Sequence, residues 1–206
     1  MEHIVSFFEE NYEKYKTTLK ETSFDIVNEE YATELEHIVY SYDDIIKHAI
    51  FKNVGTSCSQ DALLFIGDTI LFIEFKNAIL EQKVFSNDKG MLKKYKMKFN
   101  EDMKNKLLLK GVEGLYIFKN VMSEHGVGLE NIKLNYILCF NEEKNFIKPE
   151  EEQIDKLMKS LRDLSDQSIV RFGLFRLQSN FYYDDVKTLD REAFKRYINK
   201  TVENSV

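Results

Sequence analysis

The sequence predicts a mixed α/β domain, with a central sheet covered by helices on both faces. Segments of helical and of strand periodicity alternate along the chain, an order typical of α/β folds. Two strands around Gly67-Asp68 carry apolar side chains on both faces, which indicates a central hairpin with helices on each side. The length of 206 residues, with 43% hydrophobic and 31% charged residues, fits one domain.

The first fifty residues are predicted to form two amphipathic helices that separate near Thr22-Ser23. Aromatic residues recur at helical spacing from Phe7 to Tyr15. A second apolar stripe follows at Tyr31, Leu35, Ile38, Tyr42, Ile45 and Ala49. A β-prone piece over 50–54 then leads into a polar loop at 55–59.

The next segments, 61–66 and 69–76, predict two strands joined by Gly67-Asp68. Glycine at the first central position is typical of a two-residue type II′ turn. With this turn, opposed residues have numbers that sum to 135, so Asp61 lies opposite Glu74. Alternation along the strand then places Lys76 on the same face as both acids.

This register opposes two carboxylates, which requires a compensating charge. At about 5 Å and an effective dielectric constant of about 20, the repulsion between two such charges is about 3 kcal/mol. A hard divalent cation such as Mg²⁺, typically held by one or two carboxylates, offsets the repulsion between Asp61 and Glu74. The alternative is that Asp61 caps its strand while Glu74 and Lys76 form an ordinary solvated ion pair.

The remaining elements follow from periodicity and from single turn residues. Residues 90–110 predict a Lys-rich helix, and 115–118 either a short strand or more helix. Further predictions are a strand over Lys133–Phe140, a helix from Pro149 to about Leu164, a strand over Val170–Leu177 and a closing helix from Asp190 to about Val202.

Charge is unevenly distributed along a chain whose net charge is −6. Residues 1–50 contain twelve acids against four Lys, and residues 83–110 contain nine Lys against three acids. Lys93 and Lys94 are the members of the basic segment that face least toward the core, so we expect them to contact nucleic-acid phosphates. The alternative is a solvated helix face.

Several function classes are excluded by absent patterns. The sequence has no Gly-rich phosphate loop, which argues against NTPases and dinucleotide enzymes. It has no apolar run long enough for a membrane helix and does not begin with a signal-peptide pattern, so we expect a cytoplasmic protein. Cys58 and Cys139 lack metal-ligand spacing and are expected to be free thiols.

The hairpin carries a family resemblance. Its pattern Asp-x12-Glu-x-Lys, in "QDALLFIGDTILFIEFK", resembles the PD-(D/E)xK nuclease superfamily and is most similar to the hairpin of archaeal Holliday-junction resolvases. Gln60 stands where the family has a proline. The resemblance implies a restriction-endonuclease-like core over residues 25–140 of a single domain, preceded by a helical extension over 1–24 and followed by C-terminal elements over 141–206.

The resemblance also implies roles for individual residues. Asp61 and Glu74 match the metal-binding acids, and the backbone carbonyl of Phe75 is expected at the same Mg²⁺ ion, with Mn²⁺ as the alternative metal. Lys76 would orient the attacking water and stabilise charge on the phosphate. Members of the family often add an acid from the helix before the hairpin, and helical projection selects Glu34 for this position.

The predicted function is therefore hydrolysis of DNA, rather than RNA, by a metal-dependent endonuclease, which the resemblance implies to be a homodimer. One alternative is a catalytically silent protein of the same fold that binds nucleic acid or a protein partner, for example in a mobile-element or phage-defence system. Another is an α/β interaction module of different ancestry. The five arginines, all within the last 45 residues, and the Tyr residues near them form either a recognition surface or an oligomer interface.

Overall fold

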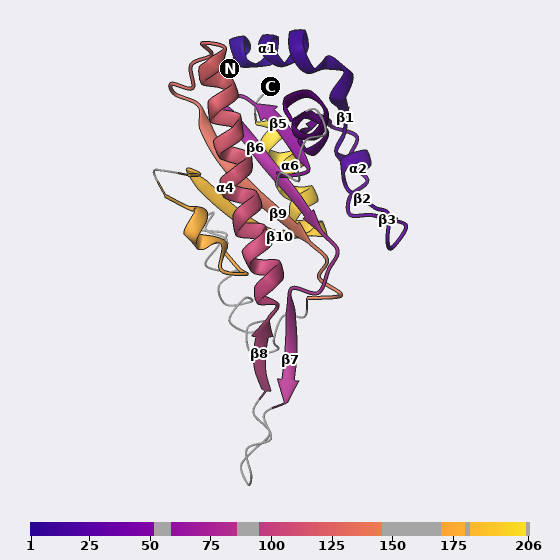
Figure 1. Ribbon diagram of the computed structural model, residues 1–206. Coiled ribbons are helices and arrows are strands. Elements are labelled where there is room, and N and C mark those ends of the chain that lie inside the picture. Colours follow the sequence, from indigo (N-terminus) through magenta and orange to yellow (C-terminus); the bar gives the residue numbers. More distant parts are fainter. Residues whose placement is uncertain (52–58, 86–94, 146–169, 180–181, 205–206) are drawn as a thin grey trace.

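The computed structural model describes residues 1–51, 59–85, 95–145, 170–179 and 182–204. Within these ranges the chain forms a mixed α/β structure around a six-stranded sheet (Figure 1). The strand order is β1-β4-β5-β6-β9-β10. The strands are β1 (Lys16–Thr18), β4 (Ile38–Ser41), β5 (Ala62–Ile66), β6 (Thr69–Lys76), β9 (Lys133–Phe140) and β10 (Asp185–Asp190).

The hairpin of β5 and β6 has the register that the sequence predicts. Ile66 pairs with Thr69, and each further pair down to Ala62 with Ile73 has numbers that sum to 135. Gly67 has a positive φ of 57°, and Asp68 does not have a positive φ. This combination is expected for a type II′ turn, because a type I′ turn needs positive φ at both central residues. The other edge of β6 pairs in parallel with β9, so β6 is central in the sheet.

Each face of this hairpin contributes to a separate hydrophobic core, which confirms the predicted two-sided burial. Leu63, Ile70 and Phe72 pack in the core that also contains α1 (Glu2–Tyr12) and α4 (Glu101–Glu124). Side chains of alternate positions pack in the core that contains α6 (Arg191–Glu203). Figure 1 shows α4 crossing one face of the sheet and α6 lying behind the other.

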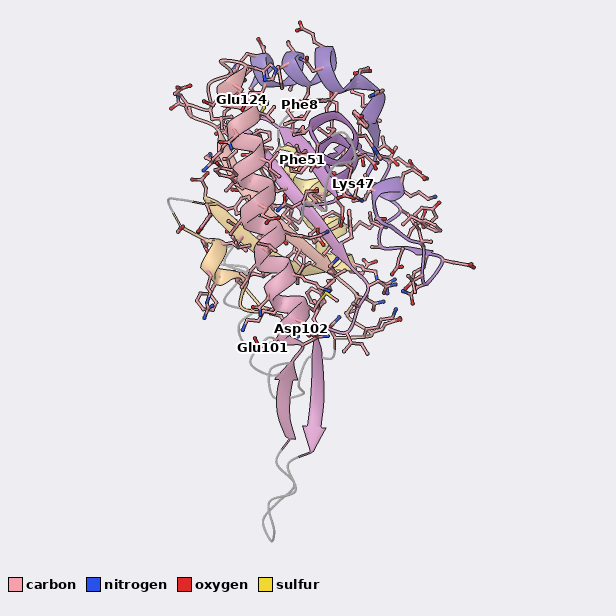
Figure 2. The ribbon with its side chains drawn as sticks, in the orientation of Figure 1. Phe8, Lys47, Phe51, Glu101, Asp102 and Glu124 are labelled. Carbon is pink, nitrogen blue, oxygen red and sulfur yellow. The ribbon has the colours of Figure 1, made fainter. Side chains whose placement is uncertain are left out.

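Local capping explains where the two long helices begin. The side chain of Asn100 accepts a hydrogen bond from the backbone N–H of Met103, and two acids follow in the first turn of α4. Figure 2 shows these acids, Glu101 and Asp102, at the end of α4 beside β7 (Glu81–Phe85) and β8 (Tyr95–Phe99). Asp190 caps α6 in the same way, as the sequence predicts for this helix start.

Shorter elements complete the described structure. They are η1 (Glu13–Tyr15), α2 (Leu19–Thr22), β2 (Phe24–Asp25), β3 (Glu30–Tyr31), α3 (Tyr42–Asp44), η2 (Ile45–Ile50) and η3 (Leu174–Leu177). Strands β2 and β3 pair as a small hairpin, and so do β7 and β8, which project from one end of the sheet (Figure 1). Among the described residues no helix combines the length and the apolar character needed to cross a membrane.

The second amphipathic helix predicted over residues 31–49 is wrong. Residues 38–41 form β4, in which Val39 and Tyr40 are buried on opposite faces of the sheet. The open edge of β5 requires a partner, and β4 supplies it through the pair Tyr40 with Leu63. Only residues 42–50 are helical, as α3 and η2.

Two further predictions of secondary structure are wrong. The Lys-rich segment is not one helix, because Tyr95–Phe99 forms β8 and helix α4 begins only at Glu101 and includes 115–118. The strand predicted over 170–177 is absent, because Phe172 and Gly173 have positive φ and residues 174–177 form η3. The strand β10 takes the place beside β9. Residues 52–54 of the β-prone piece, and the helix predicted from Pro149, lie outside the described residues.

Candidate functional site

The site lies where β5 begins and β6 ends. The regular pairing ends at Ala62 with Ile73, and the backbone N–H of Asp61 also donates to the carbonyl of Ile73, at 2.9 Å. The predicted pair of Asp61 with Glu74 is therefore not formed, because the strand departs from the register by one residue at Asp61, as in a β-bulge. The Asp61 carboxylate accepts a hydrogen bond from the backbone N–H of Phe75, at 2.7 Å. Asp61 is therefore held against the strand segment that carries Glu74.

Two ammonium groups neutralise Glu74, whose side chain is fully buried. Lys76 Nζ lies 2.7 Å from Glu74 Oε1. Lys110 Nζ, from helix α4, lies 2.9 and 3.0 Å from the two carboxylate oxygens of Glu74. The same Lys110 Nζ lies 3.5 Å from Asp61 Oδ1, so one cation contacts both acids.

The environment changes the proton affinity of both partners. Burial raises the pKa of Glu74 above its usual range, and the nearby negative charge of Asp61 adds to this shift, while the two ammonium groups act in the opposite direction. Burial by itself would lower the pKa of Lys110, but Asp61 and Glu74 outweigh burial and raise this pKa. Lys110 therefore stays charged at neutral pH.

Polar contacts between α4 and the sheet bring Lys110 into position. The buried amide of Gln60, next to Asp61 in the chain, donates to the backbone carbonyl of Lys110 at 2.8 Å. The buried phenols of Tyr183 and Tyr42 donate to the carbonyls of Gly111 and Gly114, at 2.9 and 2.6 Å. These three buried side chains thus hold one turn of α4 in place beside the carboxylates through hydrogen bonds to its backbone carbonyls.

Glycine permits this close approach of α4. A Cβ at Gly114 would lie 2.2 Å from Gln60 Oε1, and a Cβ at Gly111 would lie 2.6 Å from a methyl carbon of Leu177. The two residues are three apart and face the sheet side of the helix. The chain therefore uses small residues in the turn that carries Lys110.

Asp43 is an acid of this region that sequence reasoning missed. It accepts a hydrogen bond from Ser59 Oγ at 3.0 Å, pairs with Lys47, and is among the charges that raise the pKa of Lys110. Asp43 and Asp61 line the same open pocket. The sequence signal was the pair Asp43-Asp44, which lies in a segment predicted to be helical and was given no role there.

The structure brings together only some of the predicted site residues. Asp61, Glu74, Phe75 and Lys76 meet at one strand end. Glu34 is on no helix, so the projection that selected it does not hold, and its exposed side chain pairs with Lys20 at 2.7 Å. The predicted phosphate contacts, at positions 93 and 94, lie outside the described residues.

Lys110 is the main contact that the sequence did not assign to this site. It was grouped with the other lysines of a basic helix, and its partly buried position beside the carboxylates depends on how α4 crosses the sheet. In the described part of the chain, no three or more His, Cys, Asp or Glu side chains form a group that could hold a metal ion.

Comparisons of this chain with protein-family models, with curated proteins and with solved structures found no match.

Proposed function

We propose that this protein is a Mg²⁺-dependent nuclease with a restriction-endonuclease-like core that hydrolyses phosphodiester bonds of DNA. The observation that carries the proposal is the shared cation position, since one ammonium nitrogen lies within 3.5 Å of both the Asp61 and the Glu74 carboxylates. Converging carboxylate oxygens are the donors that a hard dication prefers. The donor set therefore fits Mg²⁺ or Mn²⁺.

Asp61, Glu74 and the backbone carbonyl of Phe75 would hold the metal. When bound, the ion supplies a water of lowered pKa and neutralises negative charge on the phosphate. The hydrogen bond from Phe75 N–H fixes one oxygen of Asp61 and leaves the other directed toward the shared position, where it contacts Lys110.

Lys76 is the residue best placed to act on the substrate. It lies at the end of β6, it is only partly buried, and it lines a pocket together with Asp61. Its ammonium group donates toward Glu74 and has further protons for a phosphate oxygen or for the attacking water. Lys110 is the second cation, and we propose that it balances the carboxylates when no metal is bound.

A second candidate function is favoured by Lys110 itself. Because two ammonium groups already neutralise Glu74, the acids require no metal for stability. This arrangement supports a catalytically silent protein that keeps the fold and binds nucleic acid or a protein partner. Metal binding separates the two functions, because only the nuclease needs the ion.

The test is nicking of a supercoiled plasmid in the presence of Mg²⁺ or Mn²⁺. We expect the wild-type protein to nick it, EDTA to stop the reaction, and Lys76→Ala to abolish it without a change in fold. The matched control is Lys133→Ala, which removes an exposed lysine paired with Asp68 at the other end of β6. Equal nicking by the wild type and Lys76→Ala would show a contaminating nuclease.

Further arms of the experiment test the finer parts of the proposal. A circular substrate has no ends, so its cleavage identifies an endonuclease, and a matched RNA substrate tests the preference for DNA. Sedimentation at several protein concentrations tests the proposed homodimer. A protein that binds Mn²⁺ and cleaves neither substrate would contradict the nuclease and leave the silent binding protein.

A further inference from the structure

A pocket of about 330 Å³ opens beside the carboxylate site. The β2–β3 hairpin forms one wall, and the ends of β6 and β9 with the first residue of α6 form the other. Its volume is at the lower end of the roughly 300–1,000 Å³ of small-ligand pockets. Asp61 and Lys76 are part of its lining, so a group bound there lies next to the proposed reaction.

The hairpin wall is fixed to the sheet by one acid. Glu30 accepts a hydrogen bond from the side-chain amide of Asn77, the residue that follows Lys76. Arg191 and Lys144 also lie within 3.8 Å of the Glu30 carboxylate. Through Glu30, the hairpin wall of the pocket is therefore joined to three other parts of the chain.

The lining combines an aromatic surface with polar groups. The rings of Phe24 and Tyr31 pack at 4.8 Å between centroids, and Phe24 keeps 41% of its surface exposed. The amides of Asn77 and Asn141 line the opposite side. Arg191 Nε is buried and forms no hydrogen bond within the described residues, although it lies 3.6 Å from Glu142 Oε2.

The charges of the lining disfavour a phosphate-rich ligand. Three acids, Asp25, Glu30 and Asp61, stand against two cations, Lys76 and Arg191. A neutral planar group with hydrogen-bonding edges suits such a pocket better, because it stacks on an aromatic ring and pairs with amides and a guanidinium. A nucleobase has this chemistry.

We propose that this pocket receives the base of one unpaired nucleotide adjacent to the scissile phosphate, an inference that rests on the proposed nuclease function. In a nucleic acid, the group attached to a phosphodiester is a nucleoside, so a phosphate at Asp61 and Lys76 brings a base to the pocket. A base within a duplex must first leave its stack, which costs a few kcal/mol. The preferred substrate therefore carries an unpaired nucleotide, as a bulge, flap or overhang.

The test measures binding in EDTA, where metal-dependent cleavage does not occur. The probes are a DNA duplex with a single bulged 2-aminopurine and the same duplex with that base paired. We expect the wild type to bind the bulged duplex about tenfold more tightly, with a change in 2-aminopurine fluorescence on stacking. Phe24→Ala removes the stacking surface and reduces this preference about tenfold.

The matched control is Phe175→Ala, which truncates an exposed phenylalanine that does not line the pocket. It should retain the preference for the bulge. Equal binding of the two duplexes, or equal effects of Phe24→Ala and Phe175→Ala, would overturn the inference. The nuclease proposal is tested separately by plasmid nicking. A protein that nicks the plasmid but binds the two duplexes equally would therefore contradict the base-binding pocket and leave the nuclease proposal intact.

Discussion

Lys110 donates to both carboxylate oxygens of Glu74, at 2.9 and 3.0 Å, so helix α4 supplies a cation to a buried acid at the end of β6. The acid and the base are 36 residues apart in sequence. Glu74 is fully buried and Lys110 is partly buried, so leaving the Glu74 charge unpaired is costly. The pairing links the packing of α4 to the charge balance of the site.

Lys110→Met is expected to destabilise the metal-free protein and to strengthen metal binding. Removing one partner of a buried pair costs about 3 kcal/mol, here moderated by Lys76, which still contacts Glu74. In this variant the Lys110 ammonium no longer competes with the metal for the position between the two carboxylates, so the Kd for Mn²⁺ should fall about tenfold. Urea unfolding and calorimetric titration with Mn²⁺ measure the two effects.

The control for this substitution is Lys106→Met, one helical turn away on the exposed side of α4. It should change neither the stability nor the Mn²⁺ affinity measurably. Unchanged Mn²⁺ affinity in Lys110→Met would show that the ammonium and the metal do not share a position. The case for Asp61 and Glu74 as joint ligands would then be lost.

Gly114→Ala tests whether α4 packs as closely against Gln60 as the structure indicates. The new Cβ would lie 2.2 Å from Gln60 Oε1, so the amide would have to leave the carbonyl of Lys110. Overpacking of this kind costs about 1–3 kcal/mol, partly offset by the helix propensity of alanine, about 1 kcal/mol. We expect a net loss of about 1–2 kcal/mol in urea unfolding.

Gly111→Ala is the comparison. Its Cβ would meet a methyl carbon of Leu177 at 2.6 Å, and a terminal methyl of leucine moves more readily than a buried amide with two partners. The expected loss is smaller than for Gly114→Ala. A larger loss at Gly111 would show that packing against η3, rather than the Gln60 contact, sets the position of the helix.

The hairpin could be predicted from sequence because local chemistry determines it. A Gly-Asp turn and strict alternation specify the register of β5 and β6, and the pairs from Ile66–Thr69 to Ala62–Ile73 confirm it. The prediction of that register required no knowledge of the rest of the fold. Asp61 lies beyond the last regular pair, and its position near Glu74 depends on the hydrogen bond from Phe75 N–H and on the contact with Lys110.

The elements that depend on distant partners were predicted poorly. Val39 and Tyr40 are recognised as strand residues only when the neighbouring strands β1 and β5 are known. The residues on either side of them, Ile38 and Tyr42, fit the helical stripe that the sequence predicted. Strand β10 has only Val186 and Leu189 as apolar residues, too few to be recognised before its parallel pairing with β9. Residues 95–99 alternate between apolar and charged side chains, as Tyr, Lys, Met, Lys and Phe. This period-2 pattern is typical of a strand, but the predicted Lys-rich helix over residues 90–110 included the segment.

Cys139 is expected to be unreactive in the folded protein. Burial raises the pKa of this thiol, so the thiolate that reacts with disulfide reagents does not form where an ordinary cysteine ionises, near pH 8.5. The same raised pKa determines how the free energy of unfolding depends on pH. The unfolded chain releases this proton at a lower pH than the folded chain, so the free energy of unfolding should fall as pH rises above about 8.5.

The measurement uses Cys58→Ser, which leaves Cys139 as the remaining thiol. At pH 8.5 a chromogenic disulfide should label nothing within minutes in the native protein and one thiol in denaturant. Rapid native labelling would contradict the burial of Cys139 between the sheet and α6, where it packs in the core that contains Phe194 and Ile198.

Glu30→Ala should loosen the β2–β3 hairpin without unfolding the protein. Glu30 joins that hairpin to Asn77, Arg191 and Lys144, and partly exposed ion pairs of this kind contribute about 1 kcal/mol or less. Backbone amides of residues 24–31 should exchange with deuterium about fivefold faster, while the global stability changes by less than about 1 kcal/mol. The control is Glu34→Ala, because the exposed ion pair between Glu34 and Lys20 does not reach the end of β6.

Unchanged hydrogen exchange in Glu30→Ala would contradict this role of Glu30. It would mean that the hydrogen bond from Ala32 N–H to the carbonyl of Ser23 holds the hairpin, and that the pocket wall does not depend on Glu30.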